Sequence, residues 1–141
     1  MIRRLQAHGA NLEDLKDVYI KQIRSILEFG VPVWNSSITK EDSSDIERVQ
    51  KAFLHLVLGD GYADYTNALI KLDLETLESR RVKLCTTFAT KSVKHPKHQT
   101  WFELSDAPDT RSSKPVYKVP LHRLKRYKNS PIPYLTRLLN E

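Results

Sequence analysis

Residues 11–32, NLEDLKDVYIKQIRSILEFGVP, decide the fold class of this chain. Asn11 is a strong helix N-cap, and acidic residues follow it where the positive end of a helix dipole favours them. Gly30 and Pro32 supply the stop signal, because glycine ends helices readily and proline cannot continue one. Between these limits the apolar residues recur at the 3.6-residue period of an amphipathic helix, and they are Leu12, Leu15, Tyr19, Ile23, Ile26 and Leu27.

Three further helices are predicted downstream of this stretch. One begins near Thr39 and ends before the glycine turn at 59–61; a short one covers 65–72, and a long one runs from about 74 to 94. The intervening segment 31–34 is predicted to be extended, because proline disfavours helical backbone at the residue before it. Together these elements predict an all-α fold, a small bundle of about four helices.

The helical pattern fades after residue 98, where prolines, loops and basic residues follow. We therefore expect a helical domain over 1–98 and an irregular, basic, proline-containing tail over 99–141. Within the tail, 130–133 is predicted as another break and 134–139 as a short terminal helix. A length of 141 residues with 40% hydrophobic and 28% charged residues suits one globular domain. No apolar run approaches the length of a membrane span, so no membrane partner is expected.

Charge divides the chain unevenly. Residues 1–78 carry nine Lys/Arg and thirteen Asp/Glu, a net of −4, whereas residues 79–128 carry thirteen and three, a net of +10. The remaining 13 residues balance, Arg137 against Glu141. Such an asymmetry indicates a nucleic-acid surface in the second half of the chain.

Two basic clusters are the candidate nucleic-acid-binding residues. The first lies on one side of the predicted helix 74–94, a side without acidic residues, and consists of Arg80, Lys83, Lys91 and Lys94. The second lies within 111–128, a stretch that also lacks acids, and consists of Arg111, Lys114, Lys118, Arg123, Lys125, Arg126 and Lys128. Three rings interleaved with this second cluster are of types that stack on bases: Tyr117, His122 and Tyr127.

Each basic cluster also has a plainer interpretation. Lysines on a helix commonly form a solvated face, and a basic loop can simply keep a chain soluble. If the clusters do bind nucleic acid, phosphate contacts alone would carry no sequence specificity.

Four residues are expected to be structural. Arg81 falls on the apolar stripe of its helix, and a buried guanidinium needs acceptors for its donors, so we expect it to pair with Glu47 or Glu28. Its neighbour Arg80 is expected to be the exposed one. The remaining structural predictions are core anchors, namely Trp34, Phe53 and Phe88.

No catalytic or metal-binding motif stands out. The four glycines form no phosphate-binding loop, and no nucleophile elbow occurs. Cys85, His95 and His98 supply three ligands at a spacing that is not typical of zinc sites, and a lone cysteine on an apolar stripe is more often a buried thiol. Asp60 and Asp64 flank a glycine turn but lack the spacing of a calcium loop. We expect no metal, no cofactor and no enzyme activity of its own.

Five segments, taken in order, resemble a known protein family. They are LKDVY at 15–19, IRSILEFGVPVW at 23–34, IERVQKAF at 46–53, LETLESRR at 74–81 and NSPIPYL at 129–135. Their order is similar to that of the region following the polymerase core in non-LTR (LINE-type) retrotransposon reverse transcriptases. The resemblance covers nearly the whole chain, and the combined order carries it, since no single motif is diagnostic.

The resemblance implies a C-terminal, thumb-like fragment of an RNA-directed DNA polymerase. The family's catalytic palm has an aromatic-x-Asp-Asp turn that binds magnesium, and this sequence contains no Asp-Asp pair. The implied partner is a template–primer duplex of RNA or DNA, held through its phosphates in the nucleus or cytoplasm. The implied alternative is a protein-interaction module or an inactive relic, whose apolar surface would bind the missing palm or a second copy.

Overall fold

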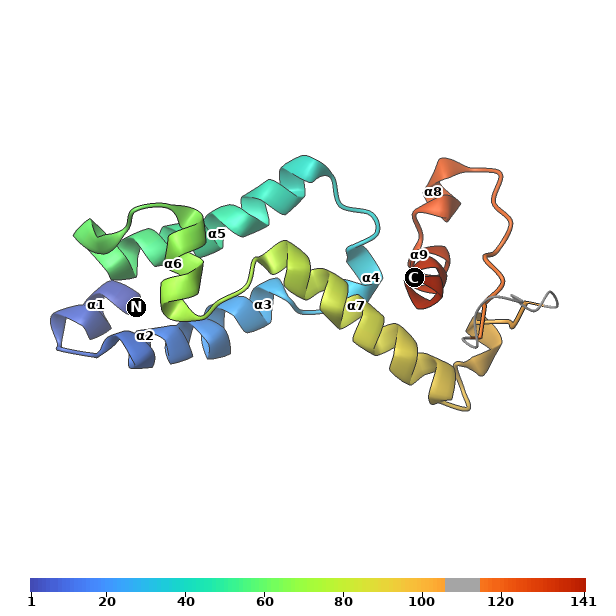
Figure 1. The fold of residues 1–141 in the computed structure, drawn as a ribbon, viewed down its shortest axis with the longest axis horizontal. Coiled ribbons are helices and arrows are strands. Elements are labelled where there is room, and N and C mark those ends of the chain that lie inside the picture. Colours follow the sequence, from blue (N-terminus) through green and yellow to red (C-terminus); the bar gives the residue numbers. More distant parts are fainter. Residues whose placement is uncertain (106–114) are drawn as a thin grey trace. The chain divides into compact units, whose positions relative to one another are not determined.

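The structure, a computed structural model, describes residues 1–105 and 115–141 (Figure 1). The described residues are helical and include no named strand, and their isolated β-bridge joins Leu104 to Tyr117 in antiparallel sense. The predicted all-α class is therefore confirmed, although the helical segments are more numerous than the four or so expected.

The chain forms two compact units, each built from two separate stretches of sequence. Unit 1 comprises residues 1–29 and 39–80, and unit 2 comprises residues 30–38 and 81–141. The domain boundary predicted between residues 98 and 99 lies inside unit 2. Each unit has its own hydrophobic core, and the two are described separately below.

Unit 1 contains helices whose N-caps follow the sequence signals. Asn11 Oδ1 accepts a hydrogen bond from the Asp14 amide at 2.8 Å, and Thr39 forms a reciprocal capping box with Asp42. Its elements are α1 (Ile2–Ala7), α2 (Leu12–Val18), the π-helical η1 (Tyr19–Arg24), α3 (Ser25–Leu27), α5 (Lys40–Leu58), the 3₁₀ turn η2 (Gly59–Gly61) and α6 (Tyr65–Leu72).

The helix predicted over residues 12–29 is continuous but contains the π-helical segment η1. A π-turn accommodates one residue more than an α-turn, so the residues after it are rotated about the helix axis by roughly 100°. Ile26, predicted on the apolar stripe, is 75% exposed. Glu28, which the same helical period places on the opposite, polar face, is largely buried. Both predictions were wrong because they assumed a constant period of 3.6 residues.

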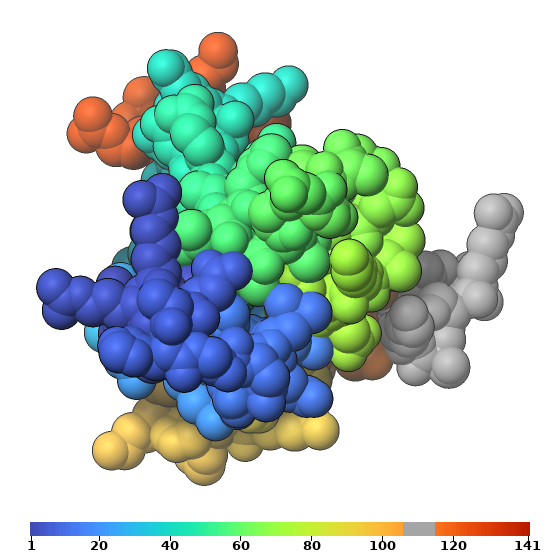
Figure 2. Space-filling view, turned by 90° about the vertical axis from the view of Figure 1, so that its left-hand side faces the viewer, coloured from blue at the N-terminus to red at the C-terminus, as the bar shows by residue number. Residues whose placement is uncertain are grey.

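The core of unit 1 forms between α1, α2, η1, α5 and α6. Tyr19 and Phe53 stack at its centre with ring centroids 4.2 Å apart, so the prediction that Phe53 is a core anchor is confirmed. In Figure 2 the blue N-terminal segment lies against the green segments of α5 and α6. The other buried members are Ile2, Leu15, Leu54, Val57, Ala68, Leu69, Leu72 and Leu74.

Unit 2 contains two helices with a proline in the first turn. Residues 31–34, predicted to be extended, form the short helix α4 (Val31–Trp34), and residues 131–133, predicted as a break, begin α9 (Pro131–Asn140). Both prolines lie in a first turn, where a backbone N–H has no intrahelical acceptor and its loss costs little. The other elements are most of α7 (Leu77–Lys94), the 3₁₀ turn η3 (Gln99–Trp101) and α8 (Lys125–Lys128).

The core of unit 2 joins α4, α7 and α9 to the segment around Phe102. Its buried members are Val31, Cys85, Ala89, Phe102 and Leu135, and burial raises the pKa of the Cys85 thiol. The predicted anchors pack against this cluster and are half-buried; they are Trp34 and Phe88. The segment expected to be a tail therefore supplies part of a hydrophobic core.

Candidate nucleic-acid interface

Helix α7 carries the first basic cluster, and a buried polar network holds its first turn in unit 1. Glu47 Oε1 accepts a hydrogen bond from the Leu77 amide at 3.1 Å, which satisfies one of the free N–H groups at the start of the helix. The same carboxylate oxygen accepts a hydrogen bond from the Tyr65 hydroxyl. A side chain of α5 thus fixes where α7 begins.

Gln50, which is fully buried, extends this network to η1. Its Oε1 accepts from the Tyr19 hydroxyl at 2.7 Å, and its Nε2 donates to the Tyr65 hydroxyl at 3.0 Å and to the Glu75 carbonyl at 2.9 Å. Buried polar groups are stabilising only when they are satisfied in this way. The network links η1, α5 and α6 to the residues just before α7.

The two tyrosines of this network should make unit 1 sensitive to high pH. Burial raises the pKa of both tyrosines. For Tyr65, the hydrogen bond that its hydroxyl donates to the Glu47 carboxylate raises the pKa further. A pKa that is higher in the folded than in the unfolded state stabilises the fold below about pH 10, the ordinary value for tyrosine. This stability is lost as the pH rises beyond that value.

Tyr19→Phe should therefore flatten the loss of stability between about pH 9 and pH 11. At neutral pH it should cost about 1 kcal/mol, because the hydrogen bond to Gln50 is lost. Urea unfolding followed by circular dichroism at several pH values measures both effects. Tyr127→Phe, at an exposed position, is the matched control. An unchanged alkaline slope in the Tyr19 variant would contradict the assignment.

Arg80, predicted to be exposed on the basic face, is half-buried and paired. Its guanidinium donates two hydrogen bonds to Glu28, through Nε to Oε1 and through Nη2 to Oε2 at 3.0 Å. This carboxylate raises the pKa of Arg80, while burial and the Arg80 charge lower the pKa of the neighbouring Arg24. Arg80 is therefore removed from the candidate interface and assigned to the framework of unit 1.

Arg81 is buried in unit 2, as predicted, with 2% of its surface exposed. Its Nε donates to the Asn35 side-chain oxygen at 3.0 Å. Asn35 in turn donates to the Tyr134 hydroxyl at 3.1 Å, which connects α7 to α9. The expected pairing of Arg81 with Glu47 or Glu28 was wrong, because Glu28 pairs with Arg80 and Glu47 caps α7.

The remaining cations of the first cluster form an exposed row on α7. Lys83, Lys91 and Lys94 all lie on the solvent side, and no acidic residue occurs between Ser79 and Phe102. At 1.5 Å per residue the row is about 16 Å long. That length corresponds to about five base-pair steps of 3.4 Å along the axis of a duplex. The row can therefore follow a phosphate backbone.

The second basic cluster is exposed wherever the structure describes it. Arg123 precedes α8, and Lys125, Arg126 and Lys128 lie on it. The described members are Lys118, Arg123, Lys125, Arg126 and Lys128, whereas Arg111 and Lys114 lie outside the described residues.

Among the rings interleaved with this cluster, His122 and Tyr127 are exposed. Tyr117 packs against the core of unit 2, in an edge-to-face arrangement with Phe102, and its backbone N–H and C=O exchange hydrogen bonds with the Asn140 side chain. Tyr117 therefore contributes to the packing of unit 2, and its suggested role in base stacking stays a prediction.

Sequence reasoning missed an aromatic stack just beyond α7. His95 and His98 stack with ring centroids 4.6 Å apart, and His98 and Trp101 stack at 4.3 Å. The exposed Lys97 lies in the same segment. The signal is the regular spacing of rings at 95, 98 and 101, whereas the prediction weighed only the two histidines, together with Cys85, as metal ligands. Among the described residues no group of three or more potential ligands could hold a metal ion.

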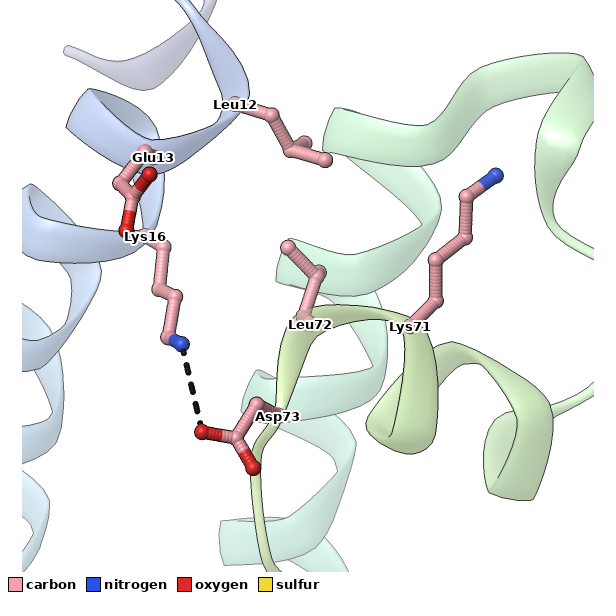
Figure 3. A pocket seen from close by; sticks show the side chains of 6 residues that line it. All are labelled: Leu12, Glu13, Lys16, Lys71, Leu72 and Asp73. Carbon is pink, nitrogen blue, oxygen red and sulfur yellow. Dashed lines mark ion pairs between the residues drawn. The ribbon is translucent and has the colours of Figure 1, made fainter.

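A shallow pocket of about 200 Å³ lies in unit 1, and none of the predicted site residues lines it (Figure 3). Its walls carry two lysines and two acids, and Lys16 approaches Asp73 at 3.9 Å. The lining residues are Leu12, Glu13, Lys16, Lys71, Leu72 and Asp73. The pocket lacks the clustered cations that phosphate binding would require.

Two further findings bear on function. Within residues 1–105 and 115–141, no helix has the length and apolar character needed to cross a bilayer. Comparisons with protein-family models, curated proteins and solved structures give no match.

Proposed function

We propose that this chain is a non-catalytic helical domain that binds nucleic acid through phosphates. The row of exposed lysines on α7, within a stretch free of acidic residues, carries the proposal. Cations aligned along one helix face can neutralise successive phosphates and release their counterions, which favours binding. The exposed cations around α8 add to the positive field.

The resemblance to non-LTR reverse transcriptases suggests a more specific role. In this hypothesis the chain corresponds to the thumb-like region that follows the catalytic palm, and its ligand is the template–primer duplex, RNA or DNA, in the nucleus or the cytoplasm. Residues 79–128 carry a net charge of +10 and residues 1–78 a net charge of −4, which agrees with this hypothesis. The fragment would grip a duplex without performing chemistry on it.

Fluorescence anisotropy with labelled RNA hairpin, DNA duplex and RNA–DNA hybrid tests the proposal. If three lysines contact phosphates, affinity for duplex DNA should fall about 40-fold between about 50 and 200 mM salt. The triple variant K83Q/K91Q/K94Q should weaken binding to all probes and reduce the slope of log affinity against log salt by nearly 3.

The matched control removes the same charge elsewhere. R3Q/R4Q/K40Q neutralises three exposed cations of unit 1 and should leave the salt slope nearly unchanged. Equal losses in the two triple variants would mean that net charge alone drives binding, and would contradict a site on α7. Absence of binding at low salt would overturn the proposal as a whole.

A second candidate function is a protein-interaction module. Ile26 and Phe29 are 75% and 84% exposed in unit 1, and exposed apolar side chains of this size commonly mark contact surfaces. In that case the partner would be a polymerase palm domain or a second copy of the chain. Sedimentation showing self-association, together with no binding of nucleic acid, would favour this candidate over the first.

A further inference from the structure

The aromatic stack beyond α7 has the features of a base-stacking platform. His98 lies between His95 and Trp101, and the ring planes are nearly parallel, with interplanar angles of 29° and 14°. Trp101 is an end ring of the stack and is 39% exposed. An indole at the end of a stack presents a flat π-face of the size that a nucleobase covers.

The charges around the stack suit a nucleotide rather than another aromatic ligand. Lys91 and Lys94 occupy the last two turns of α7, and Lys97 lies between the two histidines in sequence. All three are exposed, and the segment contains no acidic residue before Glu103. Proteins that bind single strands combine these same two elements, stacking rings and a positive track for the backbone.

A continuous duplex cannot use such a platform, because its bases are already stacked on one another. An unpaired base exposes a face, and single-stranded segments are where aromatic side chains recognise nucleic acid. Ring stacking is tolerant of sequence, since every base has a π-face. The platform therefore favours a structural feature of the nucleic acid, an unpaired nucleotide, over a particular sequence.

We propose that the stack of His95, His98 and Trp101 receives an unpaired nucleobase on the outer face of Trp101, while the exposed lysines in the same segment bind the flanking phosphates. This inference rests on the proposed function and refines it. The preferred ligand is nucleic acid with a single-stranded segment, such as a duplex with an overhang.

The experiment compares three labelled DNA probes at one salt concentration: an oligothymidylate of about 12 nucleotides, a blunt duplex and the same duplex with a thymidine overhang. The overhang should bind more tightly than the blunt duplex. W101A should remove about tenfold of the affinity for the overhang and little of the affinity for the blunt duplex. W101F should restore part of the loss, because it keeps an aromatic face. The uridine equivalents of the probes determine whether RNA is preferred.

Intrinsic fluorescence gives a readout that a loss of folding cannot imitate. A base stacked on Trp101 should quench its emission in the wild-type protein, and the quenching should disappear in W101F, where emission comes from Trp34. F29A, which removes an exposed ring from unit 1, should bind all probes like the wild type.

The outcomes separate this inference from the proposed function. Salt-dependent binding that is equal for blunt and overhang probes, without quenching and without an effect of W101A, overturns the stacking inference and leaves the phosphate-binding function standing. Absence of binding to every probe at low salt overturns both.

Discussion

Replacing Phe53 with alanine is expected to lower the free energy of unfolding by about 3–5 kcal/mol. Phe53 is 4% exposed and stacks on Tyr19 at the centre of the unit 1 core. Its loss removes buried apolar area and leaves a cavity lined by well-packed neighbours, and both effects destabilise the fold. Urea titration followed by far-UV circular dichroism gives the value.

The chain offers a matched control for this substitution in Phe29→Ala. Phe29 is 84% exposed, so the same change of side chain should alter the free energy of unfolding by about 0.5 kcal/mol or less. Similar losses in the two variants would show that Phe53 does not hold the core together.

A second large effect is expected for Leu135→Ala in unit 2, with a loss of about 2–5 kcal/mol. Leu135 lies on α9, is 2% exposed and belongs to the same cluster as Val31, Cys85 and Ala89. The expected loss follows from the structural role of α9, which a loosely attached tail would not have. Thermal melting and urea titration both report it.

Leu121→Ala is the control for the second effect. This leucine is 99% exposed, so its truncation should be almost neutral. If Leu135→Ala were equally neutral, α9 would not contribute to the core of unit 2, and the assignment of residues 81–141 to one compact unit would fail.

Local signals in the sequence predicted most of the elements. Capping residues act through hydrogen bonds within one turn, so Asn11 and Thr39 could be identified without tertiary information. The helix expected over 65–72 matches α6 (Tyr65–Leu72), which Asp64 caps. The buried positions of Phe53 and Arg81 followed from apolar periodicity in the same way.

Features that depend on tertiary packing could not be predicted from local sequence signals. Helical backbone at Pro32 needs the burial of Val31 beside it, and burial is a property of the whole unit. The choice between Arg80 and Arg81 as partner of Glu28 depended on the rotation introduced by η1. Both arginines lie in the same helix turn. The sequence does not show how far η1 rotates Glu28 about its helix axis, so it could not predict which arginine Glu28 contacts.

The candidate site was predicted in part. The shared face of the exposed lysines on α7 could be predicted from the helical period alone, because a regular helix fixes which residues lie on the same side. The stack of His95, His98 and Trp101 lies beyond the helix end, where no such period applies. The packing of Tyr117 was not predicted, because it depends on Phe102 and α9, which are distant in sequence or were expected to be irregular.

The π-helical segment η1 also marks a place where this helix can lose a residue. The wider π-turn holds one residue more than an α-turn, so deleting one residue between Tyr19 and Arg24 restores a regular α-turn and leaves the downstream stretch on the same face. Glu28 would then still face Arg80. The same deletion in a regular helix, such as the middle of α5, would rotate every downstream residue by roughly 100°. Descendants of a single-codon deletion in η1 would therefore keep the ion pair between Glu28 and Arg80.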